Sequence, residues 1–275
     1  MKSILIATAI GLLLISCKKG STGEEKQKQT LLTEVSIDGL TNLRFIYNSD
    51  NLLSKIDSYK ADPADNSVAS YVTFQYDDKG QIAFFTAYSL PGNVGMSKIT
   101  VQYDGDGKFV STTTYDLQGA SPNTPYSTTA YSYNAKGQVN KIVEKNKDGE
   151  VTLQSNLFYY DNGHIKEIQR WKNSGGILWM AGKDSYSSSN GTYPHGMEQL
   201  QVLLGSDFIA KMYSDAISHL SYSQIGAITK QWNEQMSARE FNEDATLKKQ
   251  VLTAKYIKPL SDDKVYVVEY KYTKQ

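Results

Sequence analysis

Four side chains with the chemistry of a binding site lie within 25 residues of one another: Trp171, Trp179, Tyr193 and His195. Exposed rings of this kind can stack on sugar rings or on a peptide. We interpret the four as candidate ligand-binding residues. The alternative is that they hold their own segment against the rest of the domain, because large rings are mostly buried in proteins.

Cys17, the only cysteine of the chain, indicates a different chemistry. Residues 1–17 begin with Lys2 and continue in an apolar run from Ile4 to Ile15, which is shorter than the roughly 20 residues that cross a bilayer. The run ends in Leu-Ile-Ser-Cys, which resembles a bacterial lipobox. We expect a lipoprotein signal peptide, cleavage before Cys17, and acyl chains on Cys17 that anchor the protein to a membrane. A transmembrane anchor or an ordinary signal peptide is the alternative.

Residues 18–30 are polar and rich in Gly, Ser, Lys and Glu, and they are predicted to be a disordered tether. We expect residues 31–275 to form a single domain. This organisation predicts a lipid-anchored outer-membrane protein that is either periplasmic or exposed at the cell surface.

Motifs for catalysis or metal binding are missing from the sequence. His164, His195 and His219 are not at ligand spacing, and no nucleophile elbow, phosphate loop or Cys-His pair is present. Asp104-Gly105-Asp106-Gly107 resembles the start of a calcium loop, but Lys108 replaces the next ligand. We therefore expect no enzyme activity, no metal and no cofactor. Two carboxylates could still converge as in a glycosidase.

Charge excludes one class of partner. The chain carries 29 basic and 29 acidic residues and has no basic stripe, which argues against nucleic-acid binding.

The segment that must position these residues is a repeat from Leu43 to Trp171. A tyrosine followed by Asp or Asn, two or three turn residues and usually Gly occurs five times, with tyrosines 29, 27, 30 and 27 residues apart. Such a fixed period is the signature of a repeat architecture. The five tyrosines are Tyr47, Tyr76, Tyr103, Tyr133 and Tyr160.

Each copy predicts a β-hairpin. Val72, Phe74 and Tyr76 alternate with polar residues, which is the pattern of a half-buried strand. The Asx residue and the Gly suit a type I turn with a G1 bulge, and the fifth copy, one residue shorter, suits a two-residue turn. Apolar residues three apart on the return strand, such as Ile82 and Phe85, predict a β-bulge directly after the turn.

These hairpins resemble the YD repeat of bacterial secreted and surface proteins. The lipoprotein context is similar to that of a family of uncharacterised lipoproteins, mainly of Bacteroidetes, with a porin-like β fold. The resemblance covers about residues 33–275. It implies a fold and a cell-envelope location, and it implies no activity.

Residues 172–235 depart from the period and are predicted to form an insert. Met197, Leu200 and Leu204 lie at helical spacing, and a second short helix is predicted over residues 207–214. Residues 241–247 look like a degenerate sixth copy. The strand that ends the chain is expected either to pair with the first strand or to be a protected edge.

The predicted fold is all-β: an antiparallel hairpin-repeat meander that forms a curled sheet or a partly closed barrel, with a short helical insert after the fifth hairpin. Polar faces opposite the tyrosines favour a tethered domain over a lipid-embedded one. We expect a binding module for a glycan or an envelope protein. The alternatives are a structural or assembly component, which predicts a free, apolar strand edge at 43–47 or 265–272, and a hydrolase, which predicts two or more buried carboxylates in one cleft outside the turns.

Overall fold

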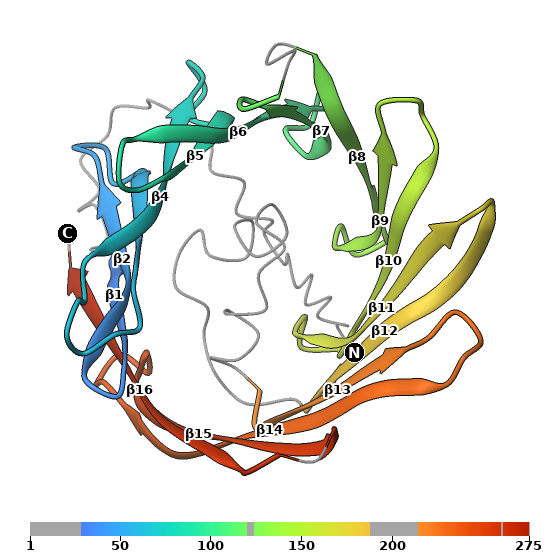
Figure 1. The fold of residues 1–275 in the computed structure, drawn as a ribbon. Coiled ribbons are helices and arrows are strands. Elements are labelled where there is room, and N and C mark those ends of the chain that lie inside the picture. The colour runs from blue at the N-terminus through green and yellow to red at the C-terminus, as the bar shows by residue number, and fades with distance from the viewer. Residues whose placement is uncertain (1–28, 120–123, 188–213, 260, 275) are drawn as a thin grey trace, which may run out of the picture.

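The computed structural model describes residues 29–119, 124–187, 214–259 and 261–274, and it shows sixteen antiparallel strands closed into one barrel (Figure 1). Each strand pairs with its neighbours along the chain. The strands are β1 (Thr30–Ile37), β2 (Leu40–Tyr47), β3 (Leu53–Tyr59), β4 (Val68–Tyr76), β5 (Ile82–Ser89), β6 (Val94–Tyr103), β7 (Phe109–Asp116), β8 (Pro125–Tyr133), β9 (Val139–Asn146), β10 (Val151–Tyr159), β11 (Ile165–Ser174), β12 (Ile177–Tyr186), β13 (Ala216–Tyr222), β14 (Ile228–Phe241), β15 (Leu247–Lys258) and β16 (Lys264–Lys274).

The antiparallel hairpin meander is confirmed, but the prediction of a curled or partly closed sheet is wrong because the barrel closes completely. β1 pairs with β16 from Thr30↔Lys274 to Ile37↔Val268. Of the two outcomes expected for the last strand, pairing with the first strand is therefore the one observed. Closure depends on the strand number and on the accumulated tilt and twist of all the strands, which no local pattern records.

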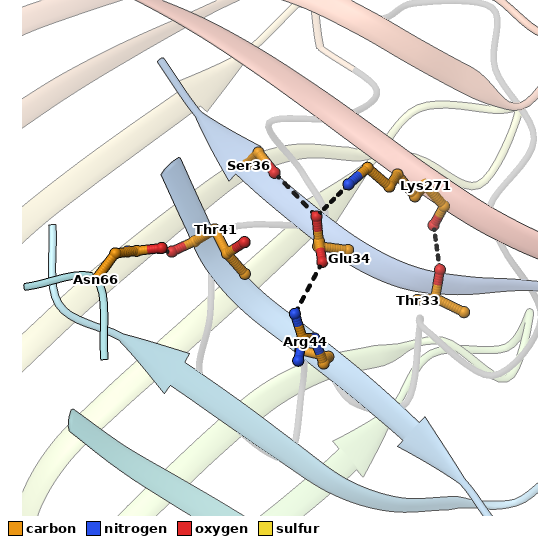
Figure 2. Close-up of polar contacts among 7 residues, drawn as sticks. All are labelled: Thr33, Glu34, Ser36, Thr41, Arg44, Asn66 and Lys271. Carbon is orange, nitrogen blue, oxygen red and sulfur yellow. Dashed lines mark hydrogen bonds and ion pairs between the residues drawn. The ribbon is translucent and has the colours of Figure 1, made fainter. Parts of the chain in front are cut away.

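Polar contacts reinforce the seam where β1 meets β2 and β16. The Glu34 carboxylate accepts from Lys271 Nζ at 2.6 Å and from Arg44 Nη2 at 3.4 Å (Figure 2). At the far end of β1, Asp38 N–H donates to the Val267 carbonyl oxygen and Val267 N–H donates to Asp38 Oδ1, both at 2.7 Å. The two ends of the sheet are thus joined by side chains as well as by the ladder.

Residues 172–235 continue the barrel wherever they are described. They supply the end of β11, all of β12 and β13, and the start of β14. The predicted helices at 197–204 and 207–214 fall outside the described residues except at Ser214, which is not helical. No helix occurs in the described ranges, and so none there is long and apolar enough to cross a membrane.

The repeated turns have one geometry and lie at one end of the barrel, which we call the repeat rim. In the second copy, Asp77 N–H donates to the Gln81 carbonyl oxygen, and Gly80 N–H, at φ +76°, donates back to the Asp77 carbonyl oxygen. Asp77 Oδ1 also accepts from two backbone N–H groups. At this rim, turns of this form occupy residues 48–52, 77–81, 104–108, 134–138, 160–164 and 242–246, and residues 146–150 and 223–227 form the same turn at the opposite end.

The fifth and sixth turns test two predictions made from the sequence. The fifth turn is not one residue shorter, because Tyr160 occupies the Asx position and Tyr159 is the tyrosine equivalent to Tyr76. The degenerate sixth copy is confirmed, with Ala245 at φ +61° in the place of Gly.

A bulge follows every repeated turn, as predicted. In the second copy Gln75 pairs with Phe84 but Tyr76 pairs with Ile82, so that Ala83 is the extra residue. The bulge brings Ile82 and Phe85 to the same face, where both are buried. The remaining bulge residues at this rim, in chain order, are Ser54, Val110, Asn140, Lys166 and Lys248.

The tyrosine before each of the first five turns connects neighbouring hairpins. Pairing between β3 and β4 stops at Lys55↔Thr73, before the rim, and beyond it the Tyr76 hydroxyl donates to the Leu53 carbonyl oxygen at 2.7 Å. We call this contact a tyrosine latch. The other latches are Tyr47 to Leu32, Tyr103 to Ile82, Tyr133 to Phe109 and Tyr159 to Val139. Tyr272 on β16, which precedes no repeated turn, makes the same kind of contact with the Leu247 carbonyl oxygen.

The core is a belt of buried apolar side chains on the face that carries the latches. Phe74 and Phe85, for example, are each 4% exposed and pack ring against ring at 5.7 Å. Side chains converge on the concave side of a closed sheet and alternate with outward-facing ones, so we assign this face to the interior. The outward neighbours of Phe74 are Thr73 and Gln75, and Gln75 is exposed.

Candidate functional site

A pocket lies at the repeat rim between the fourth and fifth hairpins. Pairing of β9 with β10 ends at Lys141↔Asn156, and beyond that pair the two hairpins are held together by the latch from Tyr159 to Val139. The resulting pocket has a volume of about 570 Å³. It is lined by Asn134, Ala135, Lys136, Gln138, Asn140, Lys141, Asn156, Leu157, Phe158, Tyr159 and Tyr160.

The pocket combines carboxamides with aromatic rings. Asn140 is the bulge residue of β9, and its buried Oδ1 accepts no hydrogen bond from any described residue. Phe158 faces outward and is 44% exposed. Tyr160 donates its hydroxyl hydrogen to the Tyr186 carbonyl oxygen at 2.8 Å, which fixes its ring at the pocket edge. An apolar ring face beside hydrogen-bonding amides is suited to a ligand that has both apolar and hydroxyl-bearing surfaces.

A second group of functional side chains is buried on the interior face of β11 to β14. His219 is 3% exposed, its Nδ1 lies 2.9 Å from Asp184 Oδ1, and its Nε2 lies 3.6 Å from Glu234 Oε2. Arg170 forms an ion pair with the other oxygen of Asp184. The His219 ring stacks on Trp232, with 4.4 Å between centroids. Asp184 on β12 pairs with His219 on β13, and His219 pairs with Trp232 on β14. The register of the sheet therefore brings these three residues together.

The charges of this cluster balance one another. Burial alone would lower the pKa of His219, but its contacts with Asp184 and Glu234 raise that pKa to about 9. Burial alone would raise the pKa of Asp184, but the hydrogen bond from His219 and the charge of Arg170 lower it below its ordinary value. A pKa of about 9 keeps His219 protonated at neutral pH, between the carboxyl groups of Asp184 and Glu234.

We expected a hydrolase to have two or more buried carboxylates in one cleft outside the turns. Asp184 and Glu234 are two buried carboxylates outside the turns, and neither lines the two pockets described here. A glycosidase needs one of its two carboxyl groups protonated and the other ionised. Here the low pKa of Asp184 and its pairing with His219 and Arg170 favour an ionised, charge-paired group. These contacts join the side chains of β11, β12, β13 and β14 across the wall of the barrel.

The structure separates the two tryptophans that the sequence singled out. Trp171 pairs with Met180, and Trp179 is the next residue along β12, so Trp171 and Trp179 point to opposite faces of the β11–β12 hairpin. Both are partly buried, and neither indole N–H has a hydrogen-bond partner within the described residues. Tyr193, His195 and Cys17 lie outside the described residues.

Trp179 lines a smaller pocket at the opposite end of the barrel, which we call the variable rim. This pocket has a volume of about 250 Å³, and Met180, Tyr222, Ser223, Gln224 and Gly226 complete its lining.

Comparison with solved structures supports the fold. The chain is similar to the crystal structure of a porin-like protein from Bacteroides uniformis, with 13% identity over 89% of this chain and 95% of that one and a TM-score of 0.54. A porin-like protein from Bacteroides vulgatus is similar at 10% identity, over 89% and 99% of the two chains, with a TM-score of 0.43. No protein-family model matches the chain. No curated protein matches it either. At this identity the similarity to the Bacteroides uniformis protein concerns the fold alone.

Sequence reasoning missed both the rim pocket and the buried cluster. The pocket left one signal in the sequence, because Tyr160 stands where the other repeat turns have Asn or Asp. The cluster had none, because Asp184, His219 and Glu234 come from three strands and their pairing depends on register.

Proposed function

We propose that this protein is a glycan-binding module of the bacterial cell envelope, anchored through lipid on Cys17. The rim pocket carries the proposal. Its volume of about 570 Å³ lies within the range of roughly 300–1,000 Å³ that is usual for small-molecule sites. Its lining of carboxamides and aromatic rings suits the alternating hydroxyl and C–H surfaces of a sugar.

The envelope location is supported by the lipobox-like sequence at Cys17 and by a fold similar to that of porin-like Bacteroides proteins. The outward residues near the repeat rim are mixed, with polar Gln75, Gln102 and Ser132 among them, which favours a tethered barrel. Retention of radiolabelled palmitate by the wild type, and its loss in Cys17→Ser, would test the anchor directly.

A thermal-shift screen of the purified protein against oligosaccharides and cell-wall fragments tests the binding function. A ligand present at 100 times its Kd stabilises the folded state by about 2.7 kcal/mol. For a domain of this size that corresponds to a rise in Tm of about 5–10 °C. A saturable rise with one class of glycan supports the proposal, whereas no shift with any glycan contradicts it.

Two other functions stay as alternatives. An assembly component held by strand addition would need a free edge, but both strands expected to provide one, β2 and β16, are paired on both sides. A hydrolase acting at Asp184 and Glu234 would release reducing sugar from glycan substrates. Asp184→Asn would then abolish that release while leaving glycan binding at the rim intact.

A further inference from the structure

The rim pocket is an exception within a repeated structure, so the other copies serve as internal controls. The bulge residue is Ser54, Ala83 and Val110 in the first three copies but Asn140 in the fourth. The outward residue before the latch tyrosine is Ile46, Gln75, Gln102 and Ser132 in the first four copies but Phe158 in the fifth. The gap between hairpins four and five thus combines an amide at the bulge with an exposed ring, whereas the gaps between the earlier hairpins have neither an amide at the bulge nor a ring before the latch tyrosine.

Tyr160 is a third departure from the repeat. In the first four copies this position holds Asn or Asp, whose side chain accepts from two backbone N–H groups of its own turn. Tyr160 cannot make those contacts, and Asn162 Oδ1 accepts from His164 N–H instead. A ring therefore replaces a turn-stabilising group at the edge of the pocket.

The pocket is also positively charged. Of the residues that line it, Lys136 and Lys141 are basic and none is acidic. Lys166 adds a third ammonium group, which lies 5.8 Å from the centroid of the Tyr160 ring. Asp161, outside the lining, is 3.5 Å from Lys136 Nζ, but both side chains are highly exposed, so this pair is weak. A ligand in the pocket meets a net positive field.

From these features we infer that the pocket binds an acidic saccharide, with the carboxylate of a uronic-acid unit near Lys136 and Lys141. The inference rests on the proposed function and names the class of glycan. Sugar hydroxyls bond to the carboxamides of the pocket lining, Asn140 and Asn156 among them, and the sugar C–H face stacks on Phe158. A neutral glycan would satisfy the amide and the ring but would leave the lysines without a counter-charge.

Isothermal titration of the purified protein with hexagalacturonate, hexamannuronate and neutral maltohexaose tests the charge preference. We expect at least one uronate hexamer to bind about tenfold more tightly than maltohexaose at 50 mM NaCl. At 500 mM NaCl the preference should fall to about threefold or less, because salt screens attraction between exposed charges. Equal affinities for acidic and neutral hexamers at low salt would overturn the inference.

Matched variants locate the site. Lys136→Gln should weaken uronate binding at least threefold, whereas Lys79→Gln, at the same position of the second turn, should not change it. Phe158→Ala should weaken uronate binding about tenfold, whereas Phe241→Ala, a comparably exposed ring at the same rim, should not. Thermal unfolding of each variant checks that the barrel remains folded.

The outcomes separate this inference from the function on which it rests. Glycan binding by the wild type that is unaffected by Lys136→Gln and Phe158→Ala would refute this pocket and leave a glycan-binding protein with its site elsewhere. Binding of neutral glycans only would refute the acidic specificity. Binding of no glycan of either class would refute both the inference and the proposed function.

Discussion

The tyrosine latches provide a quantitative test of how this barrel is held together. Tyr76→Phe keeps the ring and deletes the hydroxyl that donates to the Leu53 carbonyl oxygen at 2.7 Å. That carbonyl lies beyond the last pair of the β3–β4 ladder, so the strand beside it offers no ladder donor in exchange. A neutral hydrogen bond contributes about 0.5–1.5 kcal/mol net. We expect a loss of about 1 kcal/mol and a fall in Tm of about 2–4 °C.

Several latches removed together should give a proportionate effect. Tyr47, Tyr103 and Tyr159 lie on β2, β6 and β10, four strands apart, which corresponds to about 19 Å at the usual strand spacing. Substitutions that far apart add to within about 0.5 kcal/mol. The triple Tyr→Phe variant should therefore lose about 3 kcal/mol, or about 6–12 °C in Tm.

Urea unfolding followed by fluorescence measures these losses, with Tyr126→Phe as the control. Tyr126 is 62% exposed, and we expect its substitution to change stability by less than about 0.5 kcal/mol. If Tyr76→Phe and the triple variant cost no more than Tyr126→Phe, the latches do not support the barrel.

Alkaline titration tests independently whether the latch tyrosines are buried, with Tyr103 as the example. Burial raises the pKa of Tyr103 to about 12, whereas its unfolded value is about 10. Because the folded-state pKa is raised, the stabilisation that comes from burying the neutral Tyr103 phenol is fully present below about pH 10. It is lost as the pH rises through about 12. Tyr103→Phe should therefore weaken the dependence of unfolding free energy on pH across that window, and an unchanged dependence would contradict the burial argument.

Three further predictions concern the cluster, the sixth turn and the seam. His219→Gln removes a cation from between Asp184 and Glu234 and should cost about 3–5 kcal/mol near pH 6. Because the pKa of His219 is raised to about 9, urea unfolding should show the cost shrinking as pH rises from about 6.5 through 9, and a pH-independent cost would contradict this. Ala245→Gly relieves the positive φ of 61° and should stabilise the protein by about 0.5–1 kcal/mol in the same assay, with any destabilisation refuting the strain. Glu34→Gln should cost about 0.5–1 kcal/mol at neutral pH, because its partners are exposed. The hydrogen bond from Lys271 lowers the pKa of Glu34, so that cost should disappear in acid as the pH falls through the lowered value, and a cost that persists there would argue against the ion pair.

Local patterns predicted the hairpins because each turn and each bulge is specified by residues that are close together in sequence. Asp77 and Gly80 specify the turn, and the three-residue step from Ile82 to Phe85 specifies the bulge. The fifth turn was misread because two consecutive tyrosines, Tyr159 and Tyr160, offer two alignments, and only hydrogen bonding decides between them.

Closure and the candidate sites depended on long-range pairing. Thr30 and Lys274 are 244 residues apart in sequence and adjacent in the sheet, and nothing in either strand alone requires that contact. The chemistry of Asn140 and Phe158 is visible in the sequence only as two deviations from the repeat, one in each of two hairpins. Their meeting requires the β9–β10 ladder to stop before the rim.

The latch also has a consequence for how such barrels evolve. Each tyrosine bonds only to the neighbouring hairpin, and each turn and bulge is complete within its own hairpin. Duplication or loss of one hairpin would therefore transfer a whole set of local contacts and change the circumference by two strands, while the tilt of the other strands adjusts to close the barrel again. Descendants of one ancestral hairpin can then differ in lumen width while keeping the same wall, and a deviant copy such as the fifth can acquire a new surface without disturbing the rest.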